Sequence, residues 1–271
     1  SGRYQVFVYG DTKSEYNITN ELNGEILKRV KAGLKRGTYP PAFLVQLGDF
    51  GAYGAFNEFE AYFNYTFKGN AYTREIVASF PFIALHGNHE HLLPLFFNSF
   101  ENPSKSMQGW PDLNNKGNEE KWFSFNYGPV HYVAITTGPY MDEVWYKKTQ
   151  LDWLKADLAQ AKKLKEAGKI KWVIVMCHHS IFTSGEHFID LDSYGMHEPG
   201  SYVDVIESSG TVDICLTAHD HNYERSKNIK GYRWVKKDGK KSYIKLENAF
   251  AEEGSGRFGE ATKGKGTIYF V

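Results

Sequence analysis

Residues 81–90 read PFIALHGNHE, an apolar run followed directly by a polar segment. The run Pro81–Leu85 is short, apolar and bounded by turn residues, which predicts a buried strand. The segment Gly87-Asn88-His89-Glu90 then places an amide, an imidazole and a carboxylate directly after this strand. The strand therefore delivers polar side chains at its C-terminal end.

Four other apolar runs end in the same way. These runs and the polar residues after them are Tyr4–Tyr9 with Gly10-Asp11, Phe43–Leu47 with Gly48-Asp49, Trp172–Cys177 with His178-His179, and Val212–Thr217 with His219-Asp220-His221. Strand and helix signals alternate along the chain, which predicts an α/β protein with mixed sheets and helices outside them. Ligands of open α/β sheets gather at the carboxyl ends of the strands, so we expect the five polar segments to form the site.

The remaining elements follow from periodicity. Leu22–Leu34 has apolar residues near a helical period, and a second helix is expected where Leu151, Leu154, Leu158, Ala161 and Leu164 share one face. Residues 122–137 predict a hairpin, with its turn at Tyr127-Gly128-Pro129. Further expected elements are a short helix at Ser201–Ser208 and strands within residues 232–246 and 267–271. The aromatic residues at 53–67 are expected to pack a helix into the core, with a substrate-cleft wall as the alternative.

Composition excludes several classes of protein. Of the 271 residues, 41% are hydrophobic and 24% charged, and 32 basic residues balance 32 acidic ones. A general nucleic-acid-binding protein would carry an excess of positive charge, and no apolar run approaches the ~18 residues of a membrane-spanning helix. No repeat or linker divides the sequence. We therefore expect a single domain over residues 1–271, with neither nucleic acid nor membrane as partner.

The cysteines and the chain ends give weaker expectations. Cys177 and Cys215 lie within apolar runs and are expected to be buried structural thiols. The chain starts at Ser1-Gly2 without a signal peptide, and Gly266–Val271 resembles a strand entering a sheet. We expect the native protein to continue beyond residue 271.

Six side chains at the strand ends have the chemistry of metal ligands: Asp11, Asp49, Asn88, His178, His219 and His221. Carboxylate and imidazole donors together suit iron, manganese, zinc or cobalt. In an extended segment, His219 and His221 would project to the same side, because they are two residues apart. A bridging carboxylate would hold two metals about 3.5–4 Å apart, which could clamp the attacking and leaving oxygens at phosphorus. Each motif alone is weakly specific, so the hypothesis rests on their joint occurrence in this order.

The order of these motifs resembles that of the calcineurin-like metallophosphoesterases, over positions 10 to 221. Three further segments resemble the purple acid phosphatase branch: residues 125–131 (FNYGPVH), residues 150–154 (QLDWL) and residues 221–226 (HNYERS). The resemblance implies a four-layer αββα sandwich with two mixed β-sheets and a dinuclear site at their edge. It also implies hydrolysis of phosphomonoesters of small molecules, as in acid phosphatases, and favours a secreted or periplasmic location.

The resemblance also implies roles for single residues. Asp49 would bridge two divalent or trivalent metal ions, of iron, manganese or zinc. Asn88, His178 and His219 would complete the second metal site, while Asp11 and His221 would belong to the first. A hydroxide held by the metals would be the nucleophile. His89 would stabilise the phosphoryl group or protonate the leaving oxygen, and His187 would contact the substrate.

Three departures from the family pattern affect this interpretation. Lys13 stands where many members have a histidine ligand, and a protonated lysine would repel a nearby cation or offer a charge to phosphate. Ala52 stands where the purple branch has a tyrosine ligand, with Tyr53 one residue later. The third departure, Ala218 in place of a glycine, is expected to be tolerated. The first two weaken the first metal site.

Two hypotheses therefore remain open. The first is a metal-dependent phosphoesterase, most simply a phosphomonoesterase, with a diesterase as the variant within the same fold. The second is a degenerate scaffold that binds a phosphorylated ligand or a protein without turnover. Other histidines receive structural interpretations: His179 facing away from His178, His86 in or near the core, and His131 on a strand surface. His91 and His197 have no motif that assigns them a role.

Overall fold

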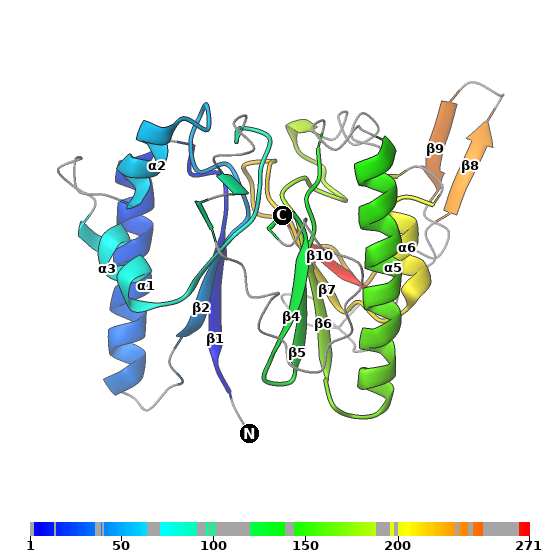
Figure 1. Ribbon diagram of the computed structural model, residues 1–271, viewed down its shortest axis with the longest axis horizontal. Helices are drawn as coiled ribbons and strands as arrows, with labels where there is room; N and C mark the ends of the chain where they lie inside the picture. Colours follow the sequence, from blue (N-terminus) through cyan, green and yellow to red (C-terminus); the bar gives the residue numbers. More distant parts are fainter. Residues whose placement is uncertain are drawn as a thin grey trace. The chain divides into compact units, whose positions relative to one another are not determined.

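The computed structural model describes residues 3–13, 15–35, 39, 41–63, 71–90, 96–97, 99–100, 120–138, 144–187, 196–197, 200–230, 233–237, 241–245 and 266–271, and of residues 16, 144–147, 233–237 and 241–245 the backbone only. The chain forms two compact units, Ser1–Asn102 (unit 1) and Pro103–Val271 (unit 2). Each unit contains a β-sheet and its helices (Figure 1).

Unit 1 contains a sheet of three parallel strands in the order β1-β2-β3. They are β1 (Gln5–Tyr9), β2 (Pro41–Gln46) and β3 (Phe82–Ala84), and the helices of the unit are α1 (Tyr16–Lys35), α2 (Phe56–Phe63) and α3 (Ala71–Ser79). Parallel neighbours end at the same edge, so the loops after all three strands meet there. This edge carries the first three polar segments.

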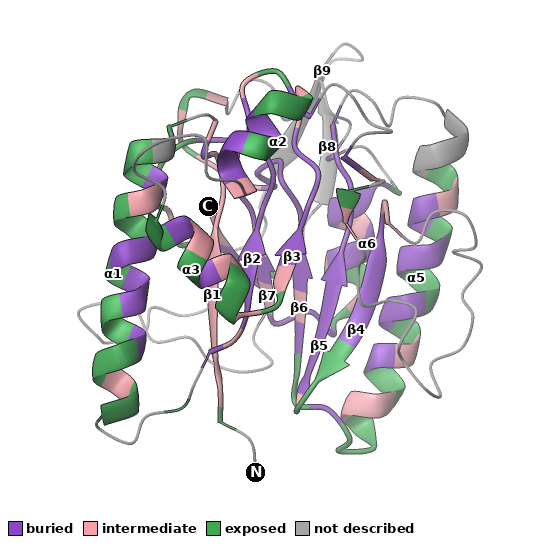
Figure 2. Cartoon of the chain, turned by 60° about the vertical axis from the view of Figure 1, so that its left-hand side comes forward, coloured by how far each residue is buried: buried purple, intermediate pink, exposed green. Residues whose placement is uncertain are grey.

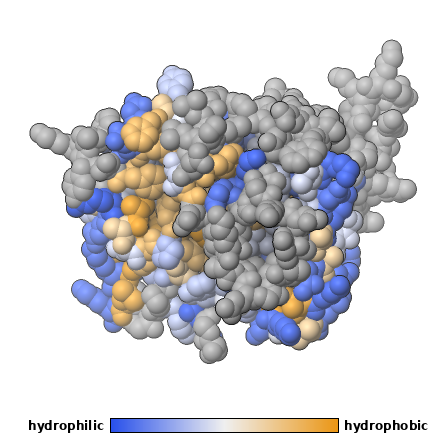
Figure 3. Space-filling model, viewed as in Figure 1, coloured by the Kyte–Doolittle hydropathy of each residue, from blue (hydrophilic) through white to orange (hydrophobic). Residues whose placement is uncertain are grey.

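The core of unit 1 has two parts. Ile26, Leu27 and Val30 of α1 pack with Leu44 of β2 and Ile76 of α3. A second cluster is mainly aromatic and contains Phe50, Phe59, Tyr62, Ala84 and Phe96. Figure 3 shows the hydrophilic outer edge of α1 and, beside it, hydrophobic side chains over the sheet of this unit.

The expected helix at Leu22–Leu34 is confirmed, and Ile26, Leu27 and Val30 of its predicted apolar face are buried, whereas the first and last residues of that face are not. Leu22 and Leu34 are 42% and 52% exposed, although both fit the apolar period. Helices α1 and α3 approach each other closely at Gly24, where a Cβ would lie 2.9 Å from the Tyr72 ring. The absence of a side chain at Gly24 therefore sets how α1 and α3 meet.

Unit 2 contains a mixed five-stranded sheet in the order β10-β7-β6-β5-β4. Its strands are β4 (Phe123–Tyr127), β5 (Val130–Ala134), β6 (Trp172–Met176), β7 (Ile214–Leu216) and β10 (Ile268–Phe270). The antiparallel β4–β5 pair confirms the predicted hairpin, with Gly128 at φ 56° in its turn. A separate two-stranded sheet pairs β8 (Arg233–Lys237) with β9 (Lys241–Lys245).

The core of unit 2 joins this sheet to α5 (Val144–Glu166) and α6 (Tyr202–Ser209). Leu151, Leu154, Leu158 and Ala161 of α5 are buried, as their spacing predicts, and Leu164 packs against them. Figure 2 shows buried residues along β5 and β6 and on one side of α5. Cys177 and Cys215 are both buried, and burial raises the pKa of the Cys215 thiol well above its ordinary value.

The sequence predictions of fold class and of most elements are confirmed by these two sheets and their helices. Core packing of the aromatic segment is confirmed for Phe59 and Tyr62 of α2, whereas residues 64–67 lie outside the described residues. Helix α3 has no counterpart among the predictions. Among the described residues, no helix combines the length and apolar character needed to cross a membrane.

Candidate metal centre

The loop after β1 and the loop after β2 are joined through their backbones. The N–H of Asp11 donates to the Gly48 carbonyl at 3.0 Å, and that of Lys13 donates to the Asp49 carbonyl at 2.9 Å. The carboxylates of Asp11 and Asp49 offer oxygens within 4.8 Å of each other. The structure therefore brings together the two acidic residues predicted from the first two motifs.

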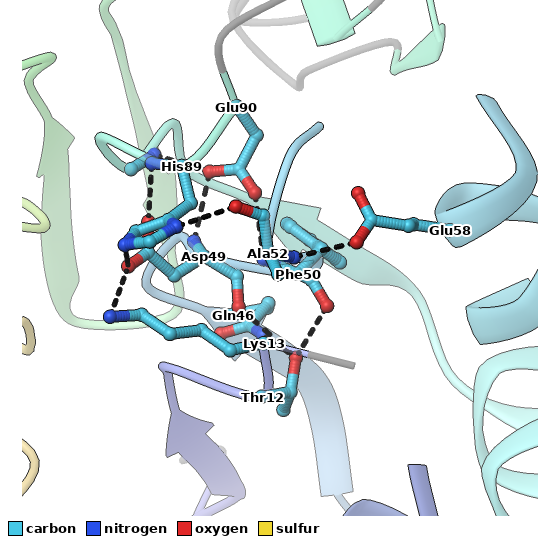
Figure 4. A network of polar contacts seen from close by, with 10 residues as sticks. Thr12, Lys13, Gln46, Asp49, Phe50, Ala52, Glu58, His89 and Glu90 are labelled. Carbon is cyan, nitrogen blue, oxygen red and sulfur yellow. Dashed lines mark hydrogen bonds and ion pairs between the residues drawn. The ribbon is translucent and has the colours of Figure 1, made fainter. Parts of the chain in front are cut away.

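Glu90 fixes the loops after β2 and β3 to each other (Figure 4). Its fully buried carboxylate accepts the backbone N–H groups of Asp49, Phe50 and Gly87, at 2.9, 2.7 and 2.7 Å. Gly87 approaches so closely that a Cβ there would lie 2.2 Å from Asp49 Oδ1. The sequence motif placed Glu90 beside the site but gave no sign of this role.

His89 lies against Asp49 in unit 1. Its backbone N–H donates to Asp49 Oδ1 at 2.9 Å, and its Nδ1 lies 2.7 Å from the Ala52 carbonyl. A carbonyl oxygen can only accept, so Nδ1 carries a proton and Nε2 faces Asp49 Oδ2 at 3.9 Å. Glu58 holds the Ala52 loop by accepting three of its backbone N–H groups, of which Figure 4 shows that of Ala52. Asn88 is partly buried between Gly87 and His89.

Lys13 contacts the same carboxylate. Its Nζ lies 3.2 Å from Asp49 Oδ2, and the lysine side chain is 19% exposed whereas Asp49 is fully buried. The side chain of Tyr53, unlike those of Lys13 and Asp49, is mostly exposed, at 74%. The ammonium group of Lys13 thus lies beside the carboxylate that the family resemblance assigns to both metals.

Unit 2 brings three histidines together where β6 and β7 end. His178, His179 and His219 each offer a ring nitrogen, and these atoms all lie within 4.8 Å of one another. The three residues are at most 3% exposed. The ring centroids of His178 and His219 are 5.2 Å apart, and the His187 ring lies 4.1 Å from the His219 ring. The predicted pair His178 and His219 is therefore adjacent, with His187 beside it.

The loop that carries His187 is fastened by two carboxylates. Asp220 accepts the His187 backbone N–H at 3.1 Å and the Thr183 hydroxyl. Glu224 accepts the Ser184 hydroxyl at 2.8 Å and the Ser184 backbone N–H. Both carboxylates belong to the segment that follows β7, so this segment positions His187 on His219.

The backbone is strained at the same positions. Five non-glycine residues have positive φ within the described ranges: Asp11 (55°), Lys13 (35°), Asp49 (60°), His219 (74°) and His221 (35°). Left-handed backbone is unfavourable for residues with a Cβ and concentrates at functional sites. Four of these residues are predicted metal ligands, and the fifth is the lysine beside Asp49.

Three expectations about histidines are wrong. His179 joins the cluster because β6 ends at Met176 and residues 178–179 form a bend, so the alternation of a strand does not apply. His131 is fully buried, with Nε2 2.8 Å from Asp157 of α5. The segment of His219 and His221 is not extended, because both residues have left-handed φ. His221 is exposed and belongs to no group of nearby ligand atoms among the described residues.

The other histidines have structural contacts. His86 is buried, as expected, and its Nε2 lies 3.1 Å from the Glu90 carbonyl. His197 is buried, with Nε2 2.6 Å from the Ile181 carbonyl. His91 lies outside the described residues. Only the motifs distinguish the candidate ligands from these buried histidines in the sequence.

The chain is similar to a known family and to several known phosphatases. The profile of the calcineurin-like phosphoesterase family matches residues 4–223. Acid phosphatase type 7 of Danio rerio is 25% identical over 245 residues, which cover 84% of this chain and 51% of the relative. Purple acid phosphatase 18 of Arabidopsis thaliana is 32% identical over 153 residues, covering 55% of this chain and 32% of the relative. The chain thus spans about half or less of the length of these relatives.

A solved structure shows the same fold. A purple acid phosphatase from yellow lupin (Lupinus luteus) seeds superposes with a TM-score of 0.57 at 18% identity, over 99% of this chain and 44% of that chain. This likeness confirms the expected metallophosphatase fold. The family profile covers most of the sequence, from before the first motif to beyond the last. The chain therefore belongs to the calcineurin-like phosphoesterase family.

Proposed function

We propose that this chain is a metal-dependent phosphoesterase that hydrolyses phosphomonoesters of small molecules at a dinuclear metal centre. The observation that carries the proposal is the strained backbone at Asp11, Asp49, His219 and His221. Left-handed φ at four non-glycine residues costs stability. Such a cost at the polar strand ends is expected where side chains must be directed at a ligand, and the family supplies the type of ligand.

The donor sets fit metal ions. Unit 1 offers two carboxylates within 4.8 Å of each other, and unit 2 offers imidazoles at the same spacing. The imidazoles suit zinc and iron, and the carboxylates also suit manganese. The close approach of the Gly87 backbone to Asp49 supports a site with a fixed geometry, because any side chain at Gly87 would displace the Asp49 carboxylate. The proposal assigns both sets, together with Asn88 and His221, to one centre, so that residues 1–271 act as a single domain.

Metal ions bound by these residues would lower the pKa of water and so supply a nucleophile near neutral pH. Asp49 is held for this task by the Glu90 network and by the His89 backbone N–H. We assign to His89 the stabilisation of the phosphoryl group or the protonation of the leaving oxygen. The Ala52 carbonyl fixes the Nδ1 side of this ring, which directs Nε2 toward Asp49.

His187 is assigned to substrate contact in unit 2. Its ring centroid lies 4.1 Å from that of His219, with the two rings tilted by 38°. Asp220 and Glu224 hold its loop in place. A positioned imidazole can donate a hydrogen bond to a phosphate oxygen. Glu224 and Asp220 would act through His187, by fixing its backbone, and would not touch the substrate.

One observation favours a second candidate function. Lys13 Nζ lies 3.2 Å from Asp49 Oδ2, where a metal would otherwise be the counter-charge of this carboxylate. A chain that keeps this ion pair would bind a phosphorylated ligand or a partner without turnover. The enzyme remains the preferred function, because a protein that only binds has no evident need for the strained ligand positions and His89 together.

The test is hydrolysis of 4-nitrophenyl phosphate by the chain loaded with zinc, manganese or iron. We expect turnover that Asp49→Asn and His219→Ala each reduce by at least about 100-fold, as loss of metal positioning should. Asp152→Asn is a matched control, since Asp152 is an exposed partner of Lys148 on α5. Undiminished turnover in either site variant would refute the assignment. Bis(4-nitrophenyl) phosphate as a second substrate would distinguish a monoesterase from a diesterase.

A further inference from the structure

His179 lies within the histidine cluster of unit 2 although the family pattern assigns only its neighbour, His178, to a metal. Its ring centroid is 5.0 Å from that of His178 and 4.6 Å from that of His219. The ligand atoms of all three rings lie within 4.8 Å of one another. His179 is fully buried, so its ring has a fixed environment.

Two neighbouring residues hold this ring in position. The Thr137 hydroxyl lies 2.9 Å from Nδ1 of His179 and also accepts its backbone N–H at 3.2 Å. Gly138, at φ 113°, leaves the space that the ring fills, because a Cβ there would lie 2.4 Å from Cε1 of His179. Since Thr137 engages Nδ1, Nε2 is the atom with which His179 can bind a metal. Histidines that bind metals are commonly oriented by such a partner on the other ring nitrogen.

We propose that His179 is a third imidazole ligand, so that His178, His179 and His219 bind one divalent transition metal in unit 2. This inference rests on the proposed metal centre and adds a ligand to it. Three imidazoles around one metal require ring nitrogens roughly 3.4 Å apart at a bond length near 2.1 Å. The observed separations reach that value with shifts of about 1 Å or less per ring.

The added imidazole also selects the metal. Neutral nitrogen donors suit zinc, ferrous iron, cobalt and copper, whereas magnesium and manganese prefer oxygen donors. The inference is therefore a site for an ion such as Zn²⁺.

The experiment compares zinc binding by the full chain and by two variants. His179→Asn retains a polar atom near the Nδ1 position, for the Thr137 contact, but removes Nε2. We expect its Kd for Zn²⁺, measured by competition with a chromophoric chelator, to rise at least about 100-fold. Zinc-edge X-ray absorption should show one imidazole fewer per chain. Thr137→Val keeps the imidazole, so the number of imidazoles should be unchanged while affinity falls about 10-fold to 100-fold.

The possible failures can be told apart. If His179→Asn binds zinc within about twofold of the parent chain, with the same number of imidazoles, His179 is not a ligand. If the parent chain itself binds no zinc, manganese or iron, the proposed function fails as well. Circular dichroism in the presence of chelator checks the fold of each variant. Should His179→Asn not fold, His179→Gln, which can place an amide near the Nε2 position, is measured instead, and an unchanged imidazole count there overturns the inference.

Discussion

The ammonium group of Lys13 lies 3.2 Å from Asp49 Oδ2, on the carboxylate that the proposed centre requires as a bridge. A metal bound by Asp49 would therefore compete with Lys13 for the same oxygen. Two unit charges about 4 Å apart interact by roughly 1–4 kcal/mol, depending on how much water screens them. We infer that the metal of the first site binds more weakly than that of the second.

Replacement of Lys13 by methionine should strengthen the weaker metal site. The variant keeps the length of the side chain but removes its charge, so we expect the weaker Kd to fall about tenfold, which corresponds to roughly 1.4 kcal/mol. Calorimetric titration with Zn²⁺ measures both sites. Lys148→Met, at an exposed ion pair with Asp152, is the control and should leave metal binding unchanged. Identical titrations of the Lys13 variant and the parent chain would show that the ion pair does not oppose metal binding.

Glu90 should matter for the stability of the fold. Its carboxylate accepts three backbone N–H groups from the loops after β2 and β3. Glu90→Gln retains a single acceptor oxygen, and we expect the free energy of unfolding to fall by about 2–3 kcal/mol. Urea unfolding measures this change. Glu75→Gln breaks only an exposed pair with Lys31 and should cost less than about 1 kcal/mol. Equal effects of the two substitutions would contradict the role given to Glu90.

Gly87 should be required for activity more than for stability. An added Cβ would lie 2.2 Å from Asp49 Oδ1 and would displace that carboxylate. A misplacement of about 1 Å can cost on the order of 100-fold in rate, which we expect for Gly87→Ala in phosphatase assays. Gly168→Ala is the control, since Gly168 has φ 71° and nothing near its Cβ position. This control should lower stability by about 1–2 kcal/mol without changing turnover. A fully active Gly87→Ala would show that Asp49 tolerates displacement.

Glu207 should make the stability of the protein depend on pH. Burial raises the pKa of its carboxyl to about 7. A hydrogen bond from the Tyr269 hydroxyl acts in the opposite direction and lowers this pKa, but its effect is smaller. The folded pKa lies above the unfolded value of 4.5, so the protonated carboxyl favours the folded state. This contribution is complete below pH 4.5 and is lost as pH rises through 7. It amounts to at most about 3 kcal/mol.

Glu207→Gln tests this pH dependence, because the amide stays neutral at every pH. We expect the variant to lose the decline in unfolding free energy between pH 4.5 and 7 that the parent chain shows. The measurement is urea unfolding at half-unit intervals of pH. Parallel curves for the two chains would mean that Glu207 does not titrate in this range.

The strand ends were predictable because each apolar run stops where a polar motif begins, as at Leu47 and Asp49. Parallel pairing then brings these ends together without any further information. His179 could not be placed in this way, because its direction depends on a bend that starts after Met176. His131 was misjudged for a similar reason: its surroundings are set by Asp157, 26 residues away on α5. A local sequence pattern does not predict contacts with residues so far away in the chain.

The central claim is tested most directly by one titration of the chelator-stripped chain with Zn²⁺ or Mn²⁺. Bound metal and hydrolysis of 4-nitrophenyl phosphate are followed in the same samples. The account predicts no hydrolysis by the stripped chain and a rise in hydrolysis as a second equivalent of metal binds, with the weaker of two affinities. Full hydrolysis without metal, or saturation with metal and no hydrolysis, would contradict it.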